Sequence, residues 1–241
     1  MNKLILNFKS KDSKKIKDPK NFLGGKGANL SEMGRMGLPV PPGFTISTKV
    51  CEIFYKDKKK LNSKLISQIK KEIKTIEKDV SKKFGDLKNP LLLSVRSGAR
   101  VSMPGMMDTI LNLGLNDKTV VALANKTSNG RFAKDSYRRF IQMYGNVVMG
   151  VESYNFEELI ENYKLTKGVL LDTDLDEEDW DGLINDFKNV VKEKTSKDFP
   201  QDVYHQLFGA ISAVFLSWES KRAKVYRKLN QIPSEWGTAV N

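Results

Sequence analysis

The stretch from Pro90 to Leu115, PLLLSVRSGARVSMPGMMDTILNLGL, contains the residue types that are most informative about chemistry in this chain. Alternating apolar residues at its start predict a strand, and the same alternation turns Ser94 and Arg96 to one face. A loop with glycines and two adjacent methionines follows, and residues 110–113 predict a second strand that closes a hairpin. Because a guanidinium is a planar fork of donors and glycines let backbone N–H groups approach anionic oxygens, we expect this segment to bind a phosphate chain.

A second candidate is the glycine cluster Gly24-Gly25-Lys26-Gly27, which we expect to open a short helix. Helix N-termini attract anions, and Lys26 adds a formal charge there. The cluster is not a Walker A motif, because Gly27 follows the lysine. It is not a dinucleotide fingerprint either, because Leu30 replaces the third glycine. Taken alone, the cluster is better explained as an ordinary loop-to-helix turn.

The other residues with reactive side chains favour structural roles. His205 is the only histidine and is expected to face solvent, whereas Cys51 is expected in the core. The run from Asp172 to Asp176 resembles the start of a calcium loop but lacks its glycine and its bidentate glutamate, so we interpret it as the acidic start of a helix. We therefore expect no metal site in this chain and no nucleophile paired with a histidine.

The composition is that of a globular protein rather than a membrane-spanning one. The 241 residues are 39% hydrophobic and 29% charged, and no apolar run approaches the roughly 20 residues of a membrane span. The net charge of +12 comes mostly from lysine runs without interleaved aromatic residues. We therefore expect neither nucleic acid nor membrane as a partner. A single cysteine fits the reducing conditions of the cytoplasm.

Periodicity predicts a mixed N-terminal part. Strands are expected at residues 4–8 and 43–46, each followed by a helix. The helix that begins at the glycine cluster should bury Leu30 and Met33. A long amphipathic helix is expected from Leu61 to Phe84.

From Asp117 onward the pattern becomes almost entirely helical. Phe132 and Phe140 are expected on one buried face of a helix, with Arg138 and Arg139 on its exposed flank. The last residues, 236–241, look like the start of a strand.

We therefore predict an α+β fold in three segments. Residues 1–115 form an α/β part, residues 116–198 form a helical subdomain, and residues 199–241 form a helix that returns to the first part.

Three segments, in this order and spacing, resemble the pyruvate, phosphate dikinase family of phosphoenolpyruvate-utilising enzymes: GGKGANLSEMGRMGLPVPPGFTIST, LLLSVRSGARVSMPGMMDTILNLGLND and GRFAKDSYRRFIQMYGNVVMGV. They are similar to the N-terminal part of that family's nucleotide-binding domain. The sequence MPGMMDTILNLGLND is typical of this family rather than of phosphoenolpyruvate synthases or glucan water dikinases. The resemblance covers nearly the whole chain and is weakest from Glu152 to Pro200.

The resemblance implies a partial ATP-grasp-like fold with an inserted helical subdomain, and a kinase-type transferase reaction. In that reaction, ATP, phosphate and pyruvate become AMP, pyrophosphate and phosphoenolpyruvate through a phosphohistidine on another domain. Lys26 and Arg96 are then the catalytic cations that contact the phosphates of ATP. The resemblance further implies that ATP is also bound by Met103, Met107, Asp108 and Thr109 of the loop and by Ser94, which lies beside Arg96.

The resemblance also places the magnesium ligands, the phosphohistidine domain and the pyruvate-binding barrel beyond Asn241. We therefore expect a fragment that is catalytically incompetent alone, from a cytoplasmic, homodimeric parent that uses ATP, phosphate and Mg²⁺. One alternative is an enzyme of the phosphoenolpyruvate synthase type, with water as the acceptor. Another is a standalone, non-catalytic module that binds a nucleotide or a partner, and the weakest is a basic nucleic-acid binder.

Overall fold

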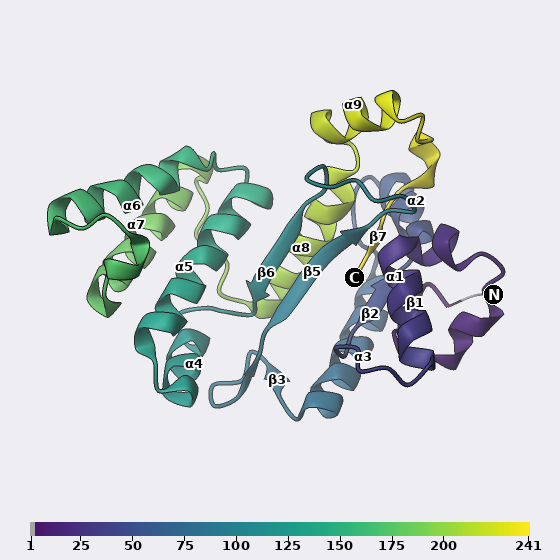
Figure 1. Cartoon of the computed structure of the whole chain (residues 1–241), viewed down its shortest axis with the longest axis horizontal. Coiled ribbons are helices and arrows are strands. Elements are labelled where there is room, and N and C mark those ends of the chain that lie inside the picture. The colour runs from purple at the N-terminus through teal and green to yellow at the C-terminus, as the bar shows by residue number, and fades with distance from the viewer. Residues whose placement is uncertain (1–2) are drawn as a thin grey trace. The chain divides into compact units, whose positions relative to one another are not determined.

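The structure is a computed structural model that describes residues 3–241 of the chain (Figure 1). It contains helices together with an antiparallel sheet, which confirms the predicted α+β class. The chain divides into two compact units. Among the described residues, the first contains residues 3–81, 94–109 and 211–241, and the second contains residues 82–93 and 110–210.

The first unit is built on an antiparallel sheet whose strands come from both ends of the chain. β1 (Ile5–Asn7) pairs with β2 (Phe44–Ile46), β2 pairs with β7 (Ala239–Val240), and β7 pairs with β5 (Leu93–Gly98). The next strand of the sheet, β6 (Thr109–Leu113), leads the chain into the second unit. These positions confirm the strands that the sequence predicted at both ends of the chain and on both sides of the glycine loop.

Helices pack on this sheet, and α1 and α2 both contact β7. The helices of this unit are η1 (Lys11–Lys15), α1 (Pro19–Arg35), α2 (Thr48–Lys56), α3 (Ser63–Val80), α9 (Lys221–Leu229) and η3 (Ser234–Trp236), with the C-terminal end of α8 (Val203–Ser217). In the core, the ring of Phe54 lies 5.3 Å from the ring of Phe215. Cys51 is buried as predicted, and burial raises the pKa of its thiol to about 11.

The predicted buried side of α1 is wrong. Met33 is 40% exposed and Leu30 is only half-buried, whereas Gly27 and Ser31 face the interior. A Cβ atom at Gly27 would lie only 2.6 Å from the hydroxyl oxygen of Thr45. The helix therefore lies so close to the sheet that only small residues fit at this contact.

The long helix ends earlier than its apolar spacing predicts. α3 stops at Val80 because Ser81 adopts a left-handed backbone with φ of 53°. Phe84, which continues the helical spacing in the sequence, lies instead in the short strand β3. The apolar spacing of a helix can thus continue past its end when the next buried residue belongs to a different element.

The second unit is mainly helical. Its elements are β3 (Lys83–Phe84), β4 (Pro90–Leu91), α4 (Thr119–Thr127), α5 (Gly130–Val147), α6 (Tyr154–Lys167), η2 (Asp172–Asp174), α7 (Glu177–Thr195) and the N-terminal end of α8. β3 and β4 pair in parallel. α5 packs against α4 and α7, and α6 packs against α7, as Figure 1 shows. The ring centroids of Phe140, Tyr144 and Phe199 lie 5.5–5.6 Å apart in its core.

Two side chains of α5 depart from the sequence prediction. Phe132 is 49% exposed rather than part of the buried face, and Arg138 is only 4% exposed. The guanidinium of Arg138 lies 4.5 Å from the ring centre of Trp180 and pairs with Asp135 at 2.5 Å. A cation can be buried when an aromatic face and a carboxylate replace its water. Arg139 is exposed, as predicted.

The acidic run before α7 is the helix start that the sequence predicted. Asp176 caps α7, and its side chain accepts hydrogen bonds from the backbone N–H groups of Glu178 and Asp179. Lys167 and these N–H groups lower the pKa of Asp176 to about 2. His205 is exposed on α8, again as predicted. No helix within residues 3–241 is long and apolar enough to cross a membrane.

Candidate functional site

A break in α1 positions the glycine cluster against the loop that follows β5. Gly24 interrupts the helix with φ of 68° and ψ of 168°. A Cβ atom on Gly24 would lie 1.7 Å from the carbonyl oxygen of Gly98, so only glycine allows this approach. The backbone N–H of Gly25 then donates to the carbonyl of Ala99 at 2.9 Å. The helix restarts there, which places Lys26 in its first turn.

The restarted helix and the loop enclose a cleft of about 430 Å³. Its lining residues are Gly25, Lys26, Asn29, Ser97, Gly98, Ala99, Val101, Ser102, Met103, Pro104, Gly105, Met107 and Thr109. This volume is within the range of small-molecule sites. The N–H of Gly25 is already used by Ala99, but the start of the restarted helix forms one wall of the cleft, and the positive end of a helix dipole favours an anion.

Lys26 is the cationic side chain of this cleft. Its ammonium donates to the carbonyl of Ser97 at 3.4 Å. Burial lowers the pKa of Lys26, and the positive charge of Arg96 lowers it further. The two cations are therefore close enough to repel each other.

Arg96 belongs to β5, and the chain alternates there as the sequence predicted. Ser94 and Arg96 are exposed, whereas Val95 between them is buried. The backbone of Arg96 exchanges two hydrogen bonds of 2.8 Å with Asn241, directly after β7. Among residues 3–241, neither Lys26 nor Arg96 forms an ion pair with an acidic side chain. Two neighbouring cations without a counter-ion leave a place for a polyanionic ligand.

The structure brings together part of the predicted site. Lys26, Met103, Met107 and Thr109 all line the cleft. Arg96 and Ser94 lie on the strand that leads to it but are not among its lining residues.

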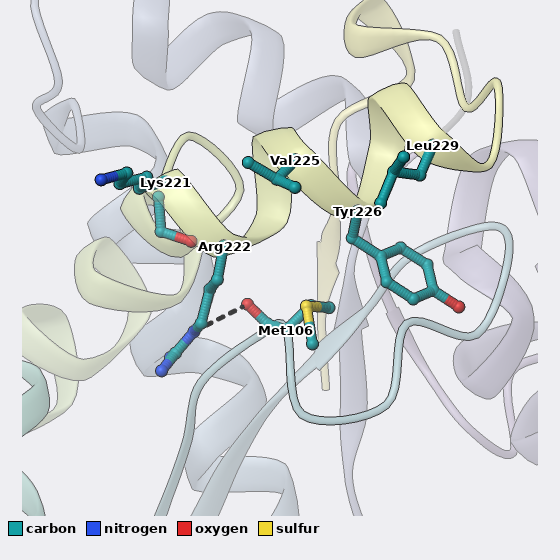
Figure 2. Close-up of a pocket in the computed structure, with 7 residues that line it drawn as sticks. Met106, Lys221, Arg222, Val225, Tyr226 and Leu229 are labelled. Carbon is teal, nitrogen blue, oxygen red and sulfur yellow. Dashed lines mark hydrogen bonds between the residues drawn. The ribbon is translucent and has the colours of Figure 1, made fainter.

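Asp108 also lies outside the lining of the cleft and is held by α9. It forms an ion pair with Arg222, and its backbone N–H donates to the hydroxyl of Ser217 at 3.4 Å. Burial raises the pKa of the Asp108 carboxyl, although Arg222 opposes this shift. Figure 2 shows Arg222 donating from α9 to the backbone carbonyl of Met106, at 3.2 Å. Arg222 thus secures the C-terminal end of the loop.

A second hollow, of about 750 Å³, lies between α9 and Met106 (Figure 2). Val225, Tyr226 and Leu229 form much of its surface, although Lys221 and Arg222 also line it. Its mainly apolar wall does not suit a phosphate chain, so the cleft beside Lys26 is the better candidate for anion binding.

The sequence did not indicate two asparagines near the cleft, Asn29, which lines it, and Asn241, which does not. Asn29 lies three residues after Lys26, and this helical spacing could have indicated that both face the cleft. Asn241 adjoins both Gly27 and Gly98, a proximity that no local pattern in the sequence indicates.

The described residues do not fit a magnesium site. Within residues 3–241, no group of three or more histidine, cysteine, aspartate or glutamate side chains could hold a metal ion. The carboxylate nearest to the loop in sequence, Asp108, is already paired with Arg222.

Comparisons with known proteins agree on one family. The family model described as the AMP/ATP-binding domain of pyruvate phosphate dikinase matches residues 20–67 and 58–241. The chain is 54% identical over 223 residues to pyruvate, phosphate dikinase of Clostridium symbiosum. This alignment covers 92% of this chain and 26% of that protein. It is 52% identical over 239 residues to the chloroplastic pyruvate, phosphate dikinase of Flaveria pringlei. That alignment covers 99% of this chain and 25% of the relative.

The chain thus spans about a quarter of the length of these relatives. The family model matches nearly all of the chain, and the cleft lies within the matched residues. The chain belongs to the pyruvate phosphate dikinase AMP/ATP-binding domain family.

Proposed function

We propose that this chain holds the triphosphate of ATP for a pyruvate, phosphate dikinase, with Lys26 and Arg96 as the cations that contact the phosphates. The observation that supports this proposal is Lys26 in the cleft with Arg96 on the strand that leads to it, two cations that repel each other and that have no acidic partner within residues 3–241. Preorganised positive charge stabilises the charge that develops on a phosphate under attack.

The nucleotide would lie along the loop that follows β5. Met103, Met107 and Thr109 line the cleft and would contact the nucleotide directly. Asp108 would hold the loop through Arg222, and Ser94 would support Arg96 from the same exposed face of β5. This arrangement corresponds to one wall of an ATP-grasp-like site, with residues 116–198 as its helical subdomain and residues 199–241 as the returning segment.

The whole protein would convert ATP, phosphate and pyruvate into AMP, pyrophosphate and phosphoenolpyruvate through a phosphohistidine. The chain spans about a quarter of its relatives, so the remaining steps would belong to other parts of such a protein. Magnesium would be held there too, because the residues described here offer no ligand set. We place such an enzyme in the cytoplasm as a homodimer.

The proposal can be tested in a chimera in which this chain replaces the matching quarter of the Clostridium symbiosum enzyme, which is 54% identical. We expect AMP formation that depends on both pyruvate and phosphate. Lys26→Gln and Arg96→Gln should each lower kcat about 100-fold or more, the cost of removing one donor from a preorganised site. Lys20→Gln, on the exposed first turn of α1, is the matched control and should leave the rate unchanged.

Binding can be measured on the chain itself. We expect the isolated chain to bind Mg-ATP only weakly, so side-chain NMR, which detects millimolar affinity, is the suitable method. Shifts confined to the cleft and lost in Lys26→Gln would support the proposal. An active chimera that is insensitive to both substitutions would contradict the roles of Lys26 and Arg96.

A further inference from the structure

We propose that Thr45 and Asn241 form a positioning pair that holds Lys26 and Arg96 at a fixed separation. The hydroxyl of Thr45 donates to Oδ1 of Asn241 at 2.8 Å. Thr45 belongs to β2, and Asn241 directly follows β7, so the hydrogen bond joins neighbouring strands of the sheet. This proposal rests on the proposed function of the two cations.

The pair lies directly beneath the residue that follows Lys26. A Cβ atom on Gly27 would lie 2.6 Å from Oγ1 of Thr45 and 2.8 Å from Oδ1 of Asn241. The restarted helix therefore rests on this hydrogen bond at Gly27, one residue from the ammonium-bearing side chain. Any movement of the pair is transmitted to the first turn of the helix because the contact leaves no free space.

The same asparagine also fixes the strand that carries Arg96. Its backbone N–H and carbonyl both bond to Arg96, each at 2.8 Å. Its side-chain nitrogen lies 2.3 Å from where a Cβ atom on Gly98 would be, so the amide packs closely against β5 at this glycine. That nitrogen is buried without a hydrogen-bond partner. Burial of an unpaired N–H group is unfavourable. The position of the Asn241 side chain is therefore better explained by its packing between Gly27 and Gly98 than by hydrogen bonding alone.

A site with two close cations needs such a device. Lys26 and Arg96 repel each other, and no acidic side chain within residues 3–241 pairs with either of them. Because like charges repel, movement of either backbone would let the two side chains move further apart. The Thr45–Asn241 pair opposes this separation by tying the backbones of α1 and β5 to one point of the sheet.

The test compares three threonine substitutions in the chain. Thr45→Val removes the hydrogen bond with little change of shape, and Thr45→Ser keeps the donor. Thr48→Val is the matched control, because the buried hydroxyl of Thr48 donates to the carbonyl of Asn21 at 2.7 Å, in the part of α1 that precedes the break at Gly24. The readout is the pKa of Lys26, obtained from competitive acetylation at several pH values and mass spectrometry of its peptide.

In Thr45→Val we expect the pKa of Lys26 to rise toward its ordinary value of 10.5, because the ammonium moves away from Arg96. Thr45→Ser and Thr48→Val should keep the wild-type pKa. The proposal is overturned if Thr45→Val leaves this pKa unchanged, or if Thr48→Val moves it equally. Circular dichroism of each variant confirms that it is folded, and Asn241→Ala serves as a second variant with the same expected rise.

Affinity for inorganic tripolyphosphate separates this proposal from the proposed function. We expect Thr45→Val to weaken binding about fivefold, the effect of one hydrogen bond, and Thr48→Val to leave it unchanged. If the pKa of Lys26 moves as expected but the wild-type chain binds no tripolyphosphate, the positioning pair is supported and the proposed function fails. If the wild-type chain binds and Thr45→Val changes neither quantity, the positioning pair is refuted.

Discussion

Lys26 is in an unusual electrostatic position for a lysine. Both burial and the charge of Arg96 lower its pKa from 10.5, so its charged form is less favourable in the folded chain than in the unfolded chain. This destabilisation is fully present below the lowered pKa, where the lysine is charged in both states. It is relieved as the pH rises through the lowered pKa toward 10.5. A bound anion acts in the opposite direction, because it favours the ammonium.

Binding of tripolyphosphate should therefore be accompanied by proton uptake at alkaline pH. Because the pKa of Lys26 is lowered from 10.5, part of it is neutral at alkaline pH below that value, and this part becomes protonated when the anion binds. Calorimetry in two buffers with different enthalpies of ionisation measures this uptake. Lys26→Arg is the control, because a guanidinium stays charged at this pH and should bind without uptake. Equal uptake by wild type and Lys26→Arg would assign the proton to another group.

The candidate site could be predicted from the sequence where one element carries the signal. Strand alternation identified the exposed side of Ser94 and Arg96, and the glycine cluster indicated a helix start at Lys26. The burial of Arg138 could not be predicted, because it depends on Trp180. This residue lies 42 positions later and is brought near only by the packing of α5 on α7. Sequence periodicity assigns a cation to the exposed face unless its partners are known.

At the scale of elements, the break in α1 is what places the start of a helix on the β5 loop. The sequence indicated that a helix begins near Gly24 but not that a helical turn precedes it, because Pro19 and Asp18 provide a separate start. Asp18 caps that first turn through the backbone N–H of Asn21 at 3.0 Å. Two start signals six residues apart are compatible with one helix or with two, and the close contact of Gly24 with Gly98 decides between them.

Gly24→Ala should therefore destabilise the chain more than the same change at Gly37. Both glycines have positive φ, 68° and 78°, so alanine is strained at either position, and at Gly24 the ψ of 168° adds to this strain because essentially only glycine adopts that backbone, at a cost of about 1–3 kcal/mol. A Cβ atom at Gly37 meets nothing within 4 Å, whereas one at Gly24 overlaps the Gly98 carbonyl. We expect Gly24→Ala to lose about 1–3 kcal/mol more free energy of unfolding, by analogy with overpacked sites. Urea denaturation measures both, and equal losses would show that the Gly98 contact can relax.

At the scale of the whole chain, the first unit is assembled from three separate segments of the sequence. The sequence predicted a strand at the C-terminal end, and β7 confirms it. It could not predict that this strand lies between β2 and β5, because strand order depends on pairing across almost 200 residues. Local patterns thus reveal which segments are extended, whereas only packing reveals their neighbours.

This strand order predicts the consequence of removing residues 237–241. When β7 is removed, the strands β2 and β5 each lose the partner on one side. The first unit also loses the contacts of α1 and α2 with β7. We expect amide hydrogen exchange in β2 and β5 to become more than about tenfold faster, as their opening becomes easier. Helices α5 and α7 pack within the second unit, so their amides should keep their protection and serve as the internal control.

If the amides of β2 and β5 stay as protected as in the intact chain, the first unit does not depend on its C-terminal strand. Faster exchange in all four elements would instead mean that the two units unfold together.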